Sequence, residues 1–437
     1  MKTLKYLPYS PNLYNIYQQL SHLPGFVLLE SADKVRGRFD IISAYPYDLV
    51  ENNGSLTGLF DELARKIPLH QSELTLPFQG GAIGFCGYEL GKHALLPNLL
   101  PKPAMVSMPH ALFGLYDWAI IVDHHLKRIS LFAANQKTHT QYIIKDILKL
   151  WQKPLANAVH AQAANLKACL TKAQYSQSFK AIKHSLYKGR CYQVNLTQPF
   201  TLDYQGTPWA IYQKISRNNP VPFAAYLHLN HHPILSFSPE RFLQISHDKI
   251  LTSPIKGSIK RARCPAKDAA LKDVLSQSVK NRAENIMIVD LLRHDLGQVA
   301  KPGSVNVQAL CTVESFKSVH HLVSHIQAHA RADITCFDIF KTCFPGGSIT
   351  GAPKHEAMKI IDELEPFARG VYCGSIGYFS AHGQADSNVA IRTMVADDKK
   401  LYLAAGGGIT IDSDLEEEYQ ECLTKLNAIL RSLDILN

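Results

Sequence analysis

The chain has 437 residues, is 46% hydrophobic and 19% charged, and carries a formal net charge of +9. This composition is typical of a soluble globular protein with enough apolar material for a large core or several domains. We expect no membrane span and no signal peptide, because the apolar stretches fall short of the roughly 18 residues that a span needs. The nine cysteines show no CxxC pair or zinc-ligand spacing, which predicts free thiols in the cytoplasm.

The positive charge is spread along the chain, without a nucleic-acid recognition motif. It therefore indicates ordinary surface chemistry or an anionic small-molecule substrate, and no nucleic-acid partner.

Residues 1–150 read as strands separated by turns, as in GFVLLES and GRFDIISAYP. The segment 151–171 is rich in Ala, Asn and Gln, shows no strand pattern and is predicted to be a linker. It would separate the N-terminal region from a C-terminal region at 172–437.

The C-terminal region mixes long helices with long strands. Tyr175, Phe179, Ile182 and Leu186 have helical spacing, and CYQVNLTQPF after them reads as a strand. The chain closes with a helix that begins near Asp414. Long elements without strict βαβ alternation predict a large α+β fold.

Several acidic residues border apolar surfaces and have two readings each. Glu240 ends a strand in SFSPERF, where it would be a general acid or a salt-bridge partner. Glu418, Glu421 and Lys425 lie along one flank of the final helix, as a salt-bridge ladder or as part of a magnesium site. Glu284, on an apolar helix face, becomes informative only as a partner of Glu421.

Other motifs also leave alternatives open. The glycines of AAGGG would admit a ligand close to the backbone or form a bulge. Arg392, expected in mid-strand, needs a carboxylate partner from the protein or a substrate. Lys256 lies in LTSPIKGSIKR, read as a strand end, a turn and a basic loop, as either a solvated charge or a positioned amine. His320, His321 and His325 lie on a predicted strand, which argues against zinc.

Taken together, these motifs resemble the chorismate-utilising enzymes. YQVNL, SPERF, SPIKG, RAENIMIVDLLRHDLG, VHHLVS, FPGGSITGAPK, CGSIGY, IRT, AGGGI and EYQECLTK follow one another in the family's order over residues 172–430. LLES and GGAIGFCGYELG resemble the N-terminal region of anthranilate and aminodeoxychorismate synthases. The resemblance implies two packed, mainly antiparallel sheets flanked by helices.

The resemblance also implies a Mg²⁺-bound chorismate substrate and a role for each matching residue. Glu284 and Glu421 would ligate the metal, with Glu418 acting through water, and Glu240 would protonate the departing hydroxyl. The other expected substrate-binding residues are Arg392, Tyr378 and the backbone of Gly407 and Gly408 for the enolpyruvyl carboxylate, and Lys425, Thr350 and His321 around the ring.

Lys256 selects the branch of the family. Anthranilate synthases read PIAG, whereas aminodeoxychorismate synthases read PIKG, as here. In that branch the lysine attacks the ring and ammonia then displaces it, a transaminase-type amination on the route to 4-aminobenzoate and folate. Gln193 stands where isochorismate and salicylate synthases carry a lysine base. Asn281 replaces an acid of many relatives, which leaves the outer magnesium shell open.

No glutamine-amidotransferase motif is found, so the resemblance implies ammonia from a separate glutaminase subunit or from ammonium. The main alternative is anthranilate synthase component I, and a further one is an inactive scaffold. Relatives can hold tryptophan in the N-terminal region, where Leu29, Glu30 and Ser31 match; an ordinary core is the alternative reading.

Overall fold

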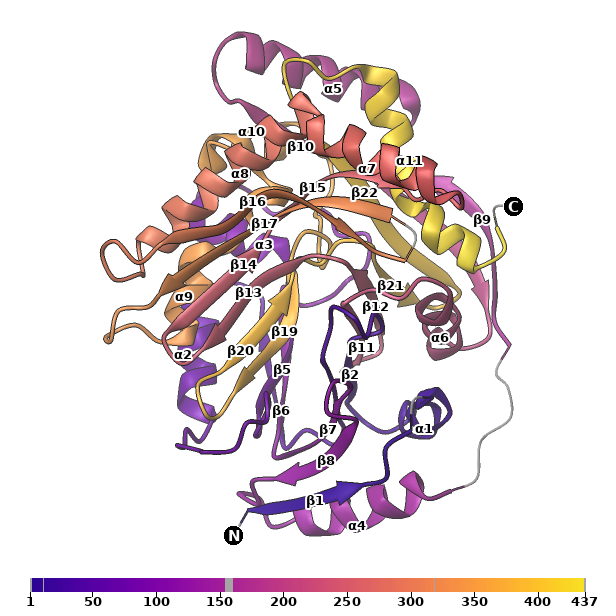
Figure 1. Cartoon of the computed structure of the whole chain (residues 1–437), viewed down its shortest axis with the longest axis vertical. Helices are drawn as coiled ribbons and strands as arrows, with labels where there is room; N and C mark the ends of the chain where they lie inside the picture. The colour runs from indigo at the N-terminus through magenta and orange to yellow at the C-terminus, as the bar shows by residue number, and fades with distance from the viewer. Residues whose placement is uncertain (1, 11, 154–159, 318, 436–437) are drawn as a thin grey trace.

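The protein is described by a computed structural model that covers residues 2–10, 12–153, 160–317 and 319–435. Two large sheets pack against each other, with helices around them (Figure 1). The paired strands are antiparallel, so the predicted α+β fold with a sandwich core is confirmed.

The larger sheet has 12 strands in the described residues. In spatial order they are β1 (Thr3–Leu7), β8 (Arg128–Ala133), β7 (Trp118–Asp123), β3 (Phe39–Ser43), β2 (Phe26–Glu30), β11 (Phe223–His228), β12 (Ile234–Ser238), β21 (Thr393–Asp397), β22 (Lys400–Ile409), β10 (Gln193–Gln205) and β18 (Gly351–Ala352), with β9 (Gln162–Ala168) also on β10.

The second sheet has 10 described strands. Their order is β15 (Ile255–Lys260), β17 (Val319–His329), β14 (Lys249–Ser253), β13 (Arg241–Ser246), β20 (Ala385–Asn388), β19 (Ser375–Ser380), β5 (Gly81–Cys86), β6 (Ala111–Tyr116) and β4 (Asp48–Asn52), with β16 (Asn306–Ser315) also on β17.

Helices cover the outer faces and the ends of the sheets. They are α1 (Tyr14–Leu20), α2 (Leu56–Lys66), α3 (Tyr88–Leu95), α4 (Thr140–Trp151), α5 (Lys172–Tyr187), α6 (Pro208–Asn218), α7 (Pro265–Gln277), α8 (Val279–Gly297), α9 (Cys336–Cys343), α10 (Lys354–Leu364) and α11 (Leu415–Ser432), with a 3₁₀ turn at Gly347–Ile349. Figure 1 shows α7, α8, α10 and α11 near β15 and β22, and α1 and α4 at the opposite end.

The core forms because central strands are covered on both faces. Every residue of β5, β6 and β7 is buried, as expected for strands that lie between a second sheet and helices. On the outer side, Phe60 of α2 contacts Phe337 and Phe340 of α9 and Phe379 of β19, with ring centroids 5.3 to 5.5 Å apart. Of the described helices, none is long and apolar enough to cross a membrane.

The predicted linker is partly wrong, because residues 162–168 form strand β9 on β10. Most side chains of β9 are exposed, so this edge strand is held by backbone hydrogen bonds and leaves no hydrophobic alternation to read. Residues 154–159, also in that segment, lie outside the described residues. Strands from residues 1–150 and from 172–437 share both sheets, and the proposed division of the chain stays a prediction.

Candidate active site

Lys256 lies on a bulged edge strand, where a turn and a loop were expected. In β15, Lys256 pairs with Leu322 and Ser258 with His321, and the register shifts between them. Gly257 at the shift has φ 74°, and a Cβ there would lie 2.8 Å from the Asn281 side chain. Both observations require glycine, since a left-handed backbone and a close neighbour exclude a side chain.

The bulge places the Lys256 amine in a polar, half-buried position. Its Nζ donates a hydrogen bond of 3.2 Å to the carbonyl oxygen of Ser348. Burial lowers the pKa of Lys256 from its ordinary value, and the charge of Lys425 acts in the same direction while Glu284 opposes it. A larger share of Lys256 is therefore neutral near neutral pH than for a solvated lysine.

Glu240 lies beside Lys256, in the connection from β12 to β13. Its side chain is buried at 4% exposure, and burial raises its pKa to about 7, against the opposing effects of the Ser348 hydroxyl and Lys256. Such a carboxyl holds a proton near neutral pH and can donate it. Ser348 contacts both groups, and the sequence reasoning did not single it out.

Three carboxylates form an acidic cluster between α8 and α11. Burial and the neighbouring charges of Glu418 and Glu421 raise the pKa of Glu284, although Lys256 and Lys280 oppose them. Burial also raises the pKa of Glu418. Glu421 is 48% exposed; burial works against its ionisation, but Lys425 at 2.6 Å lowers its pKa overall.

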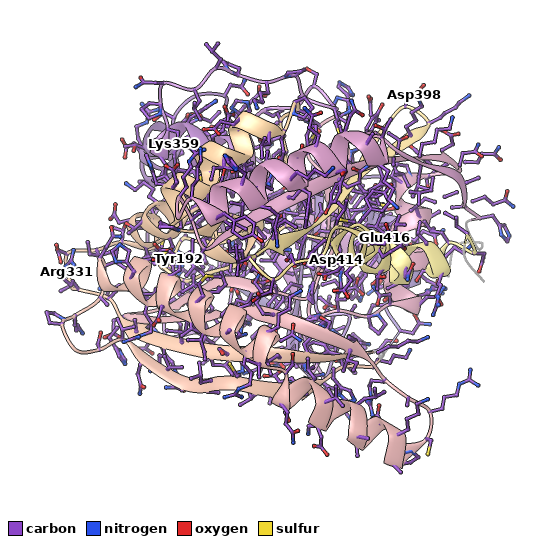
Figure 2. All side chains as sticks on the ribbon, turned by 90° about the horizontal axis from the view of Figure 1, so that it is seen from above. Tyr192, Arg331, Lys359, Asp398, Asp414 and Glu416 are labelled. Carbon is purple, nitrogen blue, oxygen red and sulfur yellow. The ribbon has the colours of Figure 1, made fainter. Side chains whose placement is uncertain are left out.

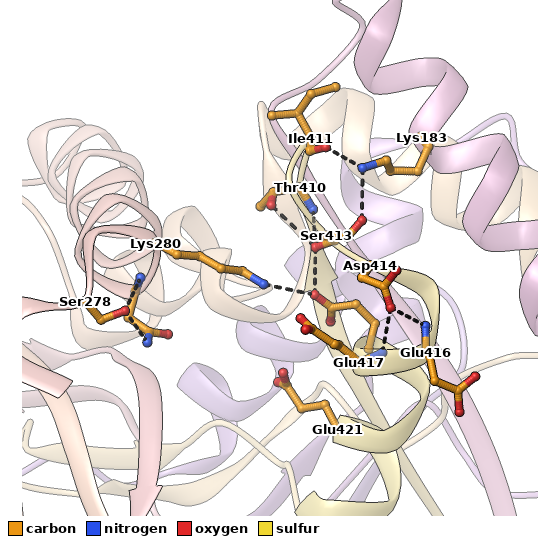
Figure 3. Close-up of polar contacts among 12 residues, drawn as sticks. Lys183, Ser278, Lys280, Thr410, Ile411, Ser413, Asp414, Glu416, Glu417 and Glu421 are labelled. Carbon is orange, nitrogen blue, oxygen red and sulfur yellow. Dashed lines mark hydrogen bonds and ion pairs between the residues drawn. The ribbon is translucent and has the colours of Figure 1, made fainter. Parts of the chain in front are cut away.

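Glu418 is held in place by residues that the sequence reasoning missed. Ser413 donates a hydrogen bond of 2.7 Å to its carboxylate, and Lys280 forms an ion pair of 3.5 Å with the same oxygen. Lys183 of α5 donates to the Ser413 carbonyl at 3.0 Å and so fixes the loop before α11. Figure 3 shows Lys280 and Glu421 extending from opposite helices toward one space. Figure 2 views the molecule from above, with Asp414 and Glu416 marking the start of α11.

The donor set has the chemistry that a hard cation prefers. Carboxylate oxygens suit Mg²⁺, and the mutual repulsion of the three acids would be relieved by a cation. Gly407 of β22 faces them: a Cβ there would lie 2.8 Å from Glu418 and 3.6 Å from Glu421. Among the described residues, however, no group of three His, Cys, Asp or Glu side chains is spaced to hold a metal.

Arg392 lies outside a strand, contrary to the expectation. It occupies the connection between β20 and β21 with φ 52°, a conformation that costs energy for a residue with a side chain. Its carbonyl accepts a hydrogen bond of 3.1 Å from the N–H of Phe237, which fixes the turn. Burial lowers the pKa of Arg392 and Glu240 opposes that effect, so the guanidinium lies near the acid and is available to a carboxylate.

His321 of β17, which pairs with Ser258, is an uncharged neighbour of Arg392. Burial and the charge of Arg392 lower its pKa to about 3. Its Nδ1 shares a hydrogen bond of 2.6 Å with the hydroxyl of Ser258, and its ring packs edge-on against Phe316 at 4.8 Å. It therefore offers a hydrogen bond and no charge.

Thr350 is fully buried and holds its own loop. Its hydroxyl donates to the Gly346 carbonyl at 3.1 Å, and its carbonyl accepts from the N–H of Asn195 at 2.9 Å. Behind this loop, Arg369 donates to the carbonyls of Ile349 and Asn195 at 3.0 and 2.9 Å. Arg369, another residue that the sequence reasoning missed, thus positions both walls.

Gly408 of β22 faces the Gln193 side chain, which would collide with any Cβ there. Gln193 is fully buried, and its amide oxygen and nitrogen have no hydrogen-bond partner in the described part of the chain. Lys425 reaches the same strand, donating to the carbonyl of Gly406 at 2.7 Å.

Two groups of predicted residues lie in other settings. Tyr378 packs in the core between the sheets, edge-on to Phe78 at 5.8 Å, so its expected contact with substrate stays a prediction. At the end of β2, Leu29 is half-buried, the Glu30 carboxylate accepts hydrogen bonds from Tyr212 and Ser216, and the N–H of Ser31 donates to Asp40. Those polar groups serve the fold, and tryptophan binding there stays a prediction.

The chain is similar to several known proteins over most of its length. Aminodeoxychorismate synthase component 1 of Salmonella typhimurium is 40% identical, over 99% of this chain and 100% of its own length. Anthranilate synthase component 1 of Lactococcus lactis is 31% identical, over 93% and 94%. The crystal structure of anthranilate synthase component I from Streptococcus pneumoniae TIGR4 superposes with a TM-score of 0.81 at 28% identity, over 90% of this chain and 92% of that one. The family described as chorismate binding enzyme matches residues 25–431, and the chain therefore belongs to the chorismate binding enzymes.

Proposed function

We propose that the chain aminates chorismate to 4-amino-4-deoxychorismate, using ammonia that a separate glutaminase subunit supplies. The observation that carries the proposal is Lys256: a half-buried amine with a lowered pKa, on a glycine bulge beside a protonatable Glu240. The 40% identity to aminodeoxychorismate synthase component 1 along the full chain supports the same branch.

In the proposed first step, the neutral amine of Lys256 attacks ring carbon 2 of chorismate. The two ring double bonds shift, the bond from carbon 4 to its hydroxyl breaks, and Glu240 gives its proton to the departing oxygen, which leaves as water. In the second step ammonia attacks carbon 4, the double bonds shift back, and the lysine is expelled from carbon 2. The Ser348 contacts keep donor and nucleophile next to each other.

Magnesium is proposed to be held by Glu284 and Glu421, with Glu418 behind them. When bound, Mg²⁺ would neutralise the ring carboxylate of the substrate and draw electrons toward it. Lys280 and Lys425 share this space and balance part of the acidic charge.

The substrate's second carboxylate is proposed to bind at Arg392. A buried guanidinium with a fixed backbone is suited to a carboxylate, and the backbone of Gly408 would contact the same group. Uncharged His321 and the Thr350 loop would border the ring without adding charge.

The test compares the ammonia-dependent turnover of chorismate in two lysine variants. Lys256→Ala should lower ammonia-dependent turnover by at least about a thousandfold, because the nucleophile is gone. Lys260→Ala, an exposed lysine on the same strand, is the control and should keep turnover. Full turnover by Lys256→Ala would contradict the covalent route.

A further inference from the structure

The loop between β2 and β3 contacts the end of strand β16, although the two segments are far apart in the chain. Arg36 makes this contact: its Nε donates a hydrogen bond of 3.4 Å to the carboxylate of Glu314, 278 residues further along. Its Nη2 donates to the carbonyl oxygen of Ser315, and its Nη1 donates to Asp33 of the same loop at 3.4 Å. All three guanidinium nitrogens are therefore engaged, which fixes the plane of the group.

The guanidinium also lies over the ring of Phe316, the residue that follows the end of β16. The Arg36 Cζ is 3.8 Å from the centre of this ring, which is the geometry of a cation–π contact. Phe316 is buried, and its N–H donates a hydrogen bond of 2.7 Å to the Val319 carbonyl, which closes the turn between β16 and β17. The same ring packs edge-on against His321, with ring centroids 4.8 Å apart. Phe316 thus joins Arg36 to His321.

His321 holds the segment that carries Lys256. It pairs with Ser258 and shares a hydrogen bond of 2.6 Å with the Ser258 hydroxyl, directly after the register shift that follows Lys256. Strand β15 is the terminal strand of the second sheet, and in the part of the chain that the structure describes it pairs with β17 alone. The position of β17 at His321 therefore determines where the Lys256 bulge lies.

The end of β16 is also linked to β17 by side chains, so the two strands move together. The second carboxylate oxygen of Glu314 lies 2.8 Å from Nε2 of His325, and the hydroxyl of Ser315 lies 2.8 Å from Nδ1 of His320. A shift of the β16 end would therefore be passed on to β17 and not absorbed within β16.

We propose that Arg36 is a positioning residue of the amination reaction. It holds the turn between β16 and β17 in place, and through His321 it keeps the Lys256 amine at its position in the site. The inference rests on the nucleophilic role proposed for Lys256. Arg36 acts through Phe316 and is assigned no contact with substrate.

The first test compares the steady-state kinetics of two arginine variants in the same loop. Arg36→Met should lower kcat for the ammonia-dependent turnover of chorismate about tenfold or more and change KM by less than about threefold, because a misplaced nucleophile reacts slowly while the substrate contacts remain. Arg38→Met is the matched control and should keep both constants. Arg38 likewise forms an ion pair, of 2.8 Å with Asp123, and lies 4.6 Å from the ring centre of Phe39, but these partners belong to the larger sheet.

Two further variants test the route from Arg36 to the site. Arg36→Lys keeps a cation over Phe316 and should lose at most about threefold in kcat. Phe316→Leu should lower kcat about as much as Arg36→Met, and the double variant should lose no more, because both substitutions break the same link. Additive losses would overturn the proposal, as would a kcat of Arg36→Met within about twofold of that of Arg38→Met.

Hydrogen exchange measured by mass spectrometry tests the positioning role apart from the reaction. The amides of β15 (Ile255–Lys260) should exchange at least about threefold faster in Arg36→Met than in the unsubstituted chain or in Arg38→Met. Faster exchange in a chain that does not aminate chorismate would contradict the proposed function and support the positioning role. Unchanged exchange would overturn the positioning role. Circular dichroism of each variant checks that it is folded.

Discussion

Replacing Glu240 with glutamine should stabilise the protein at alkaline pH while it abolishes turnover. The fold raises the pKa of this buried carboxyl from its ordinary 4.5 to about 7, so the native state binds the proton more tightly than the unfolded chain does. The stabilisation that this tighter proton binding gives the native state is fully present below pH 4.5 and is lost as the pH rises through 7. Glutamine keeps the shape, never ionises and escapes that loss.

The size of the effect follows from the same values. Compared with a side chain that never ionises, Glu240 lowers the free energy of unfolding by about 1 kcal/mol at pH 5, where only the unfolded chain releases the proton, and by about 3 kcal/mol at pH 8, since each pKa unit is worth about 1.4 kcal/mol. The gain from Glu240→Gln should therefore be about 2 kcal/mol larger at pH 8 than at pH 5.

Urea unfolding at the two pH values measures this difference, and chorismate turnover is assayed in parallel. Glu51→Gln, at an exposed carboxyl of β4, is the control and should show no such pH dependence. Equal gains at both pH values for Glu240→Gln would refute the reasoning, because the carboxyl would then ionise as it does in water.

Three further predictions concern the metal, the pH dependence and the wall of the site. Glu421→Gln should lower the Mg²⁺ affinity measured by calorimetry at least about tenfold. The control is Glu417→Gln, at an exposed carboxylate in the first turn of α11, which should keep the affinity. Equal effects of the two substitutions would show that Glu421 does not bind the metal. The second prediction concerns the rate at which the Lys256–chorismate adduct forms without ammonia, measured by intact mass. The rate should rise as the pH passes about 7 and fall above the lowered pKa of Lys256, because Glu240 and Lys256 together must carry one proton. A rate that climbs steadily to pH 10.5 would contradict the acid role of Glu240. Arg369→Met should lower the free energy of unfolding by about 3–5 kcal/mol, since it leaves a buried Glu365 unpaired, and a change below about 1 kcal/mol would show that the pair is not needed.

Much of the fold could be predicted from the sequence where one face of an element is apolar. The 3.6-residue spacing of Tyr175, Phe179 and Ile182 gave helix α5, and the run around β10 gave a strand, because burial of one face fixes the pattern. Strand β9 was not predicted, because it is held to β10 by backbone hydrogen bonds and most of its side chains are exposed. Its sequence therefore lacks the alternation of apolar and polar residues that indicates a strand.

The site was predictable at the level of motifs but not of contacts. Lys256 and Glu240 stand in recognisable motifs, yet the bulge at Gly257 depends on pairing with β17, which is over 60 residues away in the chain. Ser348 and Lys280 were missed because each acts only through a distant partner, Ser348 through Lys256 and Lys280 through Glu418. The left-handed backbone of Arg392 likewise follows from its neighbours and not from its own residue type.

The central claim is that Lys256 directs this chorismate binding enzyme toward amination at carbon 4. The most direct measurement is to incubate the purified chain with chorismate, Mg²⁺ and a high concentration of ammonium, and to identify the product by chromatography with mass detection. The account predicts 4-amino-4-deoxychorismate, which an added lyase converts to 4-aminobenzoate. Anthranilate as the product would contradict it, because the lysine would then not determine the branch; no turnover even with an added glutaminase would favour a scaffold.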